Sequence, residues 1–354
     1  MKMRAKRRTG LLGRVLYTLP AAGLFMSCSL VREGLPLCVE PALELRFVYE
    51  YNMEYANAFH RQVDCLSAYF FDTEGHLVLT ERETDVSLLS DEGYRMYPSL
   101  SAGRYHVVVY GGMDCELSSF SGSTMSEGSR LRDLQVHMNP SCLTDAERRL
   151  LHNHYYGSAD IEVLPDADSR ATVELMRNTN TIQVALQHMN GRAIDCSDFE
   201  FEITDDNNDF DHENNLLATG EIIYKPYNTL NSTTGTSDEA SSEGGYEEWH
   251  AALARFTTSR LVKRTELNNK RTSTRLHVRR VKDGETVFSI PLVNYMLMFK
   301  NNNTGAGIDY MGDQEYLDRE NRWNFVFFLD ENDMWLSTRI IINDWEVRLN
   351  TPDF

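Results

Sequence analysis

The sequence lacks an apolar stretch long enough to cross a bilayer as a helix, which takes roughly 20 residues. The hydrophobic run near its N-terminus, residues 15–27, is shorter than that and contains Pro20. No later segment is long and apolar enough to replace it. A transmembrane helix is therefore not expected, and attachment to a membrane would need another kind of anchor.

Cys28 offers such an anchor, because it follows the parts of a secretory signal in their usual order. Six basic residues come first, then the apolar run, then the small residue Ser27. This order predicts a lipoprotein signal peptide over residues 1–27, cut before Cys28, whose thiol would carry diacylglycerol. Each buried CH₂ contributes about 0.8 kcal/mol, so two or three acyl chains would hold the protein firmly. The alternative is an ordinary secretory signal cleaved elsewhere, for example after Ala22.

The sequence is also poor in basic residues, with 35 Lys and Arg against 53 Asp and Glu. Loss of residues 1–27, which hold six basic and no acidic residues, would move the formal net charge from −18 to −24. Binding to nucleic acid needs basic surface that neutralises phosphates, and docking by charge on an anionic bilayer needs it too. Neither is expected, and the acidity is interpreted as a contribution to solubility.

Motifs for catalysis are missing as well. The sequence has no nucleophile elbow, phosphate loop, zinc-protease helix or dinucleotide fingerprint. Carboxylates are abundant, but no feature selects a pair of them for acid–base work. We therefore predict a non-enzymatic protein without a cofactor, with a hydrolase that uses an unrecognised carboxylate pair as the alternative.

The cysteines have no metal-ligand spacing. Apart from Cys28 there are five, an odd number: Cys38, Cys65, Cys115, Cys142 and Cys196. An exported protein can form disulfides, but at least one of these thiols must stay unpaired within the chain. Spacing alone leaves the pairing open.

Short strands dominate the remaining pattern. Period-2 alternation predicts a strand over residues 43–51, and two runs at 68–71 and 76–80 predict a hairpin around Asp72 to Gly75. The other expected strands lie at residues 105–110, 182–186, 199–203, 324–329 and 345–349. Helices are expected only as connectors, from a capping box at Thr144 through about residue 152, and at residues 314–319.

Such a pattern indicates an all-β protein built from antiparallel sandwiches. We expect a lipidated tether at 28–37, an N-terminal β-sandwich at 38–150 and a C-terminal β-sandwich at 151–354. Residues 229–248 are rich in Ser, Thr, Gly and Glu, so we predict a flexible loop there. An exposed loop that binds a partner is the alternative.

Two polar segments are candidate metal sites. His152 and His154 are two residues apart on an expected helix end, where they would face different sides, so surface histidines are favoured. Residues 205–213 place oxygen-bearing side chains at every second position, which suits Ca²⁺. The glycine and flanking helices of an EF-hand are missing, so a solvated acidic loop is favoured and calcium binding is the alternative.

Several stretches resemble a known family. They are LRFVYEYNMEYANAF (45–59), QVDC (62–65), FFD (70–72), AGRYHVVVYGG (102–112), QEYLDR (314–319), WL (335–336) and IINDW (341–345). Their order and spacing, with the lipoprotein signal before them, resemble the FimB-like fimbrillin-associated anchor lipoproteins of type V pili. The resemblance covers most of the chain after Cys28.

This resemblance implies two tandem transthyretin-like antiparallel β-sandwiches at the surface of the outer membrane. It implies an anchor subunit, held by the lipid on Cys28, that joins the fimbrial stalk subunit by donor-strand exchange. Only residues 350–354 follow the last expected strand, so a donated strand would have to be that strand itself, and whether this subunit donates or accepts stays open.

A glycan-binding lipoprotein of a polysaccharide capture system is the alternative. It would need an exposed aromatic platform, for which Tyr49, Tyr51 and Tyr55 are the candidates. Their alternation along a strand favours burial in the core instead.

Overall fold

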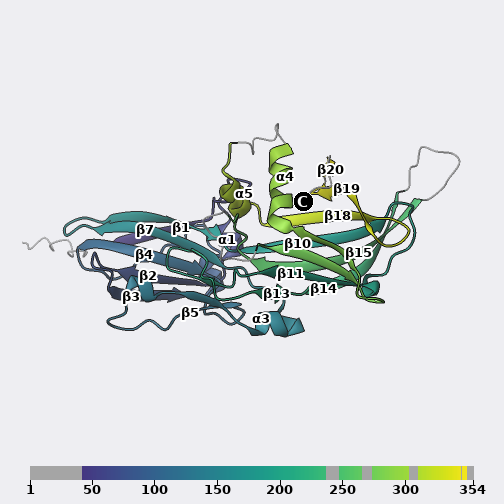
Figure 1. Cartoon of the computed structure of the whole chain (residues 1–354). Coiled ribbons are helices and arrows are strands. Elements are labelled where there is room, and N and C mark those ends of the chain that lie inside the picture. The colour runs from purple at the N-terminus through teal and green to yellow at the C-terminus, as the bar shows by residue number, and fades with distance from the viewer. Residues whose placement is uncertain (1–41, 237–246, 265–272, 303–309, 344, 349–354) are drawn as a thin grey trace, which may run out of the picture. The chain divides into compact units, whose positions relative to one another are not determined.

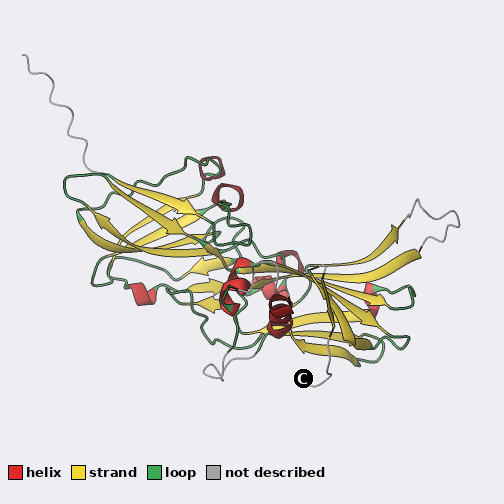
Figure 2. Ribbon diagram, turned by 90° about the horizontal axis from the view of Figure 1, so that it is seen from above, coloured by secondary structure: helices red, strands yellow, loops and turns green. Residues whose placement is uncertain are grey.

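The computed structural model describes residues 42–236, 247–264, 273–302, 310–343 and 345–348. Strands make up most of its regular structure, and the helices are short (Figure 2). The longest described helix is α4 (Leu292–Asn302), and none in the described ranges has the length and apolarity needed to cross a bilayer. The all-β expectation is confirmed.

A five-stranded antiparallel sheet organises the first half of the chain (Figure 1). Its strand order is β3 (Leu77–Glu83), β2 (Leu66–Phe71), β4 (Gly103–Gly111), β7 (Tyr155–Val163) and β9 (Met176–Arg177). The expected hairpin is confirmed as β2 and β3. A second, two-stranded sheet pairs β1 (Leu43–Val48) with β8 (Ser169–Glu174), and this pair is parallel.

All six residues of β2 are buried, because apolar side chains cover both faces of the strand. Ala68 and Phe70 point into a core shared with β1 and β8. Tyr69 and Phe71 point into another core, which continues into the second half of the chain. Burial on both faces explains why residues 68–71 form an unbroken apolar run instead of alternating.

Two further sheets form the second half. One has the order β14 (Asn228–Thr236), β15 (Glu247–Ser259), β10 (Thr179–His188), β18 (Arg322–Leu329), β19 (Trp335–Ile342) and β20 (Trp345–Arg348). The other has the order β13 (Ile222–Tyr224), β11 (Phe199–Asp205), β16 (Arg275–Arg280) and β17 (Thr286–Pro291). Their pairings are antiparallel except that of β10 with β18. Apolar side chains such as Leu186, Phe201, Val278 and Phe325 join one buried core.

A fifth, small sheet contains strands from both halves. It joins β12 (Asp209–Phe210), β6 (Val136–Met138) and β5 (Phe120–Gly122). In addition β7, β8 and β9, which follow the division expected at residues 150/151, belong to the two sheets of the first half. Backbone pairing thus links the chain on the two sides of that division.

The helices differ in part from expectation. α5 (Asp313–Arg319) is confirmed, whereas the helix expected from Thr144 to about residue 152 is wrong. α3 (Ser141–Thr144) ends there, and a single 3₁₀ turn follows at Ala146–Arg148, capped by the Asp145 carboxylate, which accepts a hydrogen bond from the Glu147 N–H. α4 went unpredicted because it is buried on most sides, so its sequence lacks a helical apolar stripe.

The expectation of a flexible loop at residues 229–248 is wrong at both ends of that range. Residues 228–236 form β14, which pairs with β15 from Asn228 opposite Arg255 to Thr236 opposite Glu247. A long antiparallel partner satisfies the backbone of a polar segment even where its side chains add little apolar burial. Residues 237–246 lie outside the described residues.

Gly112 is fixed by a close approach at the end of β4. Its φ is +71°, and its N–H donates to the Cys65 carbonyl at 3.0 Å. A Cβ at this position would lie 1.8 Å from the Asn153 carbonyl oxygen, which is backbone. Only glycine therefore allows the segment after β4 to lie so close to the segment before β7.

A Gly112→Ala variant should lose much more stability than a Gly128→Ala variant. Gly128 has a similar φ of +91° but nothing within 4 Å of the added Cβ. The control should lose about 1–2 kcal/mol from its left-handed backbone alone. Gly112→Ala should lose ~4 kcal/mol or more, because the clashing backbone must move. Urea unfolding measures both losses, and equal losses would contradict the steric argument.

Candidate functional site

The sequence-predicted lipidation site and tether, Cys28 and residues 28–37, lie outside the described residues. The described residues begin with Ala42, directly before β1. The Ala42 carbonyl accepts a hydrogen bond from the Ser169 N–H at 3.0 Å. From there β1 runs parallel to β8 with Leu43, Leu45 and Phe47 in the core. Any tether before residue 42 therefore leads into a strand that is paired and buried.

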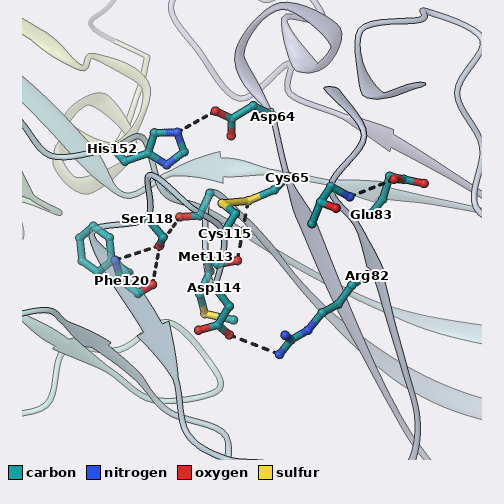
Figure 3. The surroundings of a disulfide bond; sticks show 12 residues. Asp64, Cys65, Arg82, Glu83, Met113, Asp114, Cys115, Ser118, Phe120 and His152 are labelled. Carbon is teal, nitrogen blue, oxygen red and sulfur yellow. Dashed lines mark hydrogen bonds and ion pairs between the residues drawn. A yellow bond between two sulfur atoms is a disulfide. The ribbon is translucent and has the colours of Figure 1, made fainter. Parts of the chain in front are cut away.

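The ends of three strands gather a group of polar residues that the sequence analysis did not connect. In the five-stranded sheet, Leu66 lies opposite Gly111, and Gly111 lies opposite Tyr155. The residues before β2, after β4 and before β7 therefore meet at one end of the sheet. Asp64, Cys115 and His152 lie together there (Figure 3).

A disulfide joins two of these strand ends (Figure 3). It links Cys65 to Cys115 across 50 residues, with the Cα atoms 6.4 Å apart. Closing a loop of this size stabilises the fold by about 4 kcal/mol in the chain-entropy model. Cys142 is buried and Cys196 half-buried as free thiols, and Cys38 lies outside the described residues. The pairing left open by the sequence follows from strand register, which spacing does not reveal.

Asp64 and His152 form an ion pair beside the disulfide, with Asp64 Oδ2 2.7 Å from His152 Nε2. The hydrogen bond to Asp64 raises the pKa of His152 more than burial lowers it. Burial raises the pKa of Asp64, but the hydrogen bond and charge of His152 outweigh burial and hold that pKa below its usual value. Each partner thus favours the charged form of the other. The expected surface histidine is half-buried at position 152, with its side chain 16% exposed.

His154 is not a surface histidine either, because it is fully buried in an aromatic cluster. Its ring stacks on Phe120 at 4.6 Å and on Tyr110 at 5.7 Å between centroids. The segment before β7 is not helical, and His154, the last residue before the strand, is turned inward. Burial, together with the charge of His152, lowers the pKa of His154 to about 3. The imidazole is therefore neutral in the fold at physiological pH.

This burial predicts a loss of stability in mild acid. The pKa of His154 is about 3 in the folded protein against an ordinary value of 6.5. Above pH 6.5 the group is neutral in both states and contributes nothing. Below it the unfolded chain takes up a proton that the folded chain does not, which costs about 1.4 kcal/mol per pH unit. Urea unfolding of a His154→Phe variant should show a shallower decline between about pH 6 and 4.5, and an unchanged slope would contradict the assignment.

The acidic segment at residues 205–213 is a buried network over its first part, so the favoured solvated loop is wrong there. Asp205, Asp206 and Asn207 are nearly inaccessible to solvent. Arg264 Nη2 lies 2.7 Å from Asp205 Oδ1 and 2.5 Å from Asp206 Oδ1. The Thr274 hydroxyl donates to Asp205 Oδ2 at 2.6 Å. Ion pairing to residues far along the chain is what makes this burial tolerable.

The oxygen atoms of this segment do not converge on one point. Asp209 faces His137 at 3.0 Å, and Asp211 accepts hydrogen bonds from the N–H groups of Glu213 and Asn215. Calcium needs six to eight oxygens around one centre. In the described part of the chain, the residues brought within reach of a common ion are instead Asp64, Cys115 and His152. Calcium binding at 205–213 is not supported by this geometry.

An Arg264→Leu variant should be strongly destabilised, because it leaves two buried carboxylates unpaired. Loss of one partner of a buried pair typically costs about 3–5 kcal/mol. The exposed pair of Arg104 and Glu162, 3.6 Å apart, offers a control. Arg104→Leu should cost about 0–1 kcal/mol. Both values come from urea unfolding, and a loss at Arg264 no larger than at Arg104 would contradict the buried network.

The three tyrosines considered for a glycan platform are already engaged. Tyr49 is fully buried, which confirms the preference for the core. Tyr51 and Tyr55 instead receive the guanidinium of Arg319 at the end of α5, with its central carbon 4.1 and 4.8 Å from their ring centroids. Cation–π contact of this kind fixes the rings. The preference for the core is wrong for Tyr55, which is 60% exposed, and Tyr51 is half-buried.

Comparison with known proteins adds a family match. The model of the family described as fimbrillin-A associated anchor proteins Mfa1 and Mfa2 matches residues 37–351. No curated protein matches the chain.

Solved structures extend the match. A candidate adhesin of Bacteroides thetaiotaomicron is 44% identical, with a TM-score of 0.80 over 88% of this chain and 99% of that one. A candidate polysaccharide-binding protein of the same organism is 27% identical, with a TM-score of 0.71 over the same shares. The fimbrial anchor protein Mfa2 of Porphyromonas gingivalis is 14% identical, with a TM-score of 0.59 over 87% and 99%, and shows the fold.

Proposed function

Because the chain belongs to the family of fimbrillin-A associated anchor proteins, we propose that it is the anchor subunit of a bacterial fimbria. The observation that carries the proposal is the length of the match, residues 37–351, which includes both halves of the structure. The proposed role is structural rather than catalytic. Its tandem sandwiches would couple a polymer to the cell envelope.

We place the attachment to the outer membrane at Cys28. A basic start, an apolar run and a small residue precede this cysteine, as in a lipoprotein signal peptide. Acyl chains on Cys28, palmitate among them, would hold the protein as a surface lipoprotein. Residues 28–37 would be the tether between the lipid and the folded body.

We propose that the stalk subunit joins this body by donor-strand exchange. A strand added to a sheet gains backbone hydrogen bonds along its length and side-chain pockets at alternate positions. The six-stranded sheet ends in β14 on one side and β20 on the other, and neither has a second strand partner among the described residues. Such edges supply the backbone groups that an exchange needs.

A glycan-binding surface lipoprotein is the second candidate function, because a 27% identical structure is described as a candidate polysaccharide-binding protein. Arg319 covers a face of both Tyr51 and Tyr55, which weighs against a platform made of these rings, although Tyr55 itself is exposed. A glycan array distinguishes the two functions. An anchor should give no saccharide signal. A saccharide signal that disappears when an exposed aromatic residue is mutated would favour the glycan binder.

Replacing the lipidated cysteine should release the protein. In cells that express the full chain, a Cys28→Ala variant should lose labelling by radioactive palmitate and leave the membrane fraction. Cys38→Ala is the matched control, since Cys38 lies only ten residues further along. It should keep both the label and the membrane location.

Two results would contradict the tether. One is a Cys28→Ala variant that stays in the membrane fraction with its label, and the other is release of the Cys38→Ala variant. Fimbriae shed into the medium together with the Cys28→Ala protein would support the anchor role beyond the tether itself. Intact fimbriae that stay attached to cells lacking the protein would contradict that role.

A further inference from the structure

The residues around the disulfide include more possible metal ligands than a structural cross-link requires. Asp64, Cys115 and His152 each offer a ligand atom, and these atoms lie within 4.8 Å of one another. They come from three separate places in the chain: before β2, after β4 and before β7 (Figure 3). Cys65 adds a second sulfur through its bond to Cys115.

Two polar atoms of this cluster lack a close hydrogen-bond partner. Asp64 Oδ1 and His152 Nδ1 are buried and make no hydrogen bond of good geometry to the described residues, although backbone groups of Cys65 and Gly112 lie near enough to shift the pKa values of the two side chains. A buried polar atom without a partner costs about 1–3 kcal/mol, so such atoms need an explanation. The pair between Asp64 Oδ2 and His152 Nε2 uses only one ligand atom of each residue.

We propose that reduction of the disulfide converts this cluster into a site for Zn²⁺ or a similar divalent ion, with Cys65, Cys115, His152 and Asp64 as ligands. A thiol reductant supplies two electrons and two protons, the S–S bond breaks, and the reductant leaves as its own disulfide. When the ion binds, the two cysteine thiols lose their protons to solvent and form two metal–sulfur bonds. The disulfide form lacks thiolates and does not bind the ion.

The chemical types of these ligands suit such an ion. Two thiolates with an imidazole and a carboxylate make a four-coordinate set of the kind that Zn²⁺ accepts. Tetrahedral bonding at about 2.3 Å holds two sulfurs about 3.8 Å apart. The cysteine Cα atoms are already 6.4 Å apart, so their side chains can reach one ion without a large backbone movement.

Access comes from the surface. A hollow of about 480 Å³ is lined by Asp64, both cysteines and the acidic side chains of Asp114 and Glu116. Acidic walls raise the local concentration of cations. The site would therefore be reached by the reductant and by the ion from the same side.

Either state ties the segment after β4 to the start of β2. The bound ion would replace the lost covalent bond with metal–ligand bonds, and metal-bound thiolates resist reoxidation. The bound ion would thus restore part of the stability that the disulfide supplies in the oxidised protein. The inference does not depend on the anchor function, because it rests only on the positions and chemistry of Asp64, Cys65, Cys115 and His152.

Cobalt binding tests the proposal directly, because Co²⁺ bound by thiolates gives charge-transfer and tetrahedral d–d absorption. The protein is the full chain with Cys28, Cys38, Cys142 and Cys196 changed to Ala, reduced with a phosphine and freed of reductant. It should bind one Co²⁺ per chain, and Zn²⁺ should displace it. The same protein with its disulfide intact should show no such bands.

Single variants identify the ligands. His152→Ala and Asp64→Ala should each weaken Co²⁺ binding by more than about 10-fold, the lower limit for loss of a supporting group around a metal. His106→Ala is the control, because His106 also lies 2.7 Å from a carboxylate, that of Asp160, but belongs to no such cluster. It should bind Co²⁺ like the parent.

The proposal fails if the reduced parent gives no cobalt bands, whether it stays folded by circular dichroism or unfolds and is not restored by the ion. It also fails if the disulfide form binds equally well. If His152→Ala and Asp64→Ala bind Co²⁺ as tightly as the parent does, the ion is held by the cysteines alone and the four-ligand site is wrong.

Discussion

The register of the central five-stranded sheet is the constraint on which most of the structure depends. Leu66, Gly111 and Tyr155 lie side by side across β2, β4 and β7. Because β2 and the second half of β4 (residues 107–111) are buried on both faces, a slip of one residue would move side chains of each of two cores into the other. That fixed register also brings the strand ends together, so the disulfide and the ion pair of Asp64 with His152 follow from core packing. Gly112 then permits the close approach that this arrangement imposes.

Much of the strand content could be predicted from the sequence, because alternation is a local signal. Strand partners could not, since pairing is decided by contacts between distant residues. The parallel pairings of β1 with β8 and of β10 with β18 left no trace in either strand alone. β14 looked like a loop because its stability comes from β15, and α4 looked unlike a surface helix because the core covers most of its sides.

The buried polar residues show even more clearly that local sequence patterns do not reveal contacts between distant residues. His154 and Asp205 carry side chains that are usually exposed, and the sequence gives no local reason to bury them. Burial became possible through partners far along the chain: aromatic rings around His154, and Arg264 and Thr274 beside Asp205. The link between Cys65 and Cys115 is equally non-local. Predicting such sites requires knowing the register first, and only then which polar groups it encloses.

Under the proposed anchor role, the parallel pairing of β1 acquires a mechanical meaning. On that proposal, a pull from the N-terminal side would reach the described part of the chain at residue 42, directly before β1. The strand pairs with β8 over all of its residues and buries Leu43, Leu45 and Phe47. Force along a strand loads its hydrogen bonds together, whereas force across a strand breaks them one after another. The load would also pull three apolar side chains into water, at roughly 1.5–3 kcal/mol each. If the proposed anchor role is right, an N-terminal strand held in this way would resist the tension of a polymer.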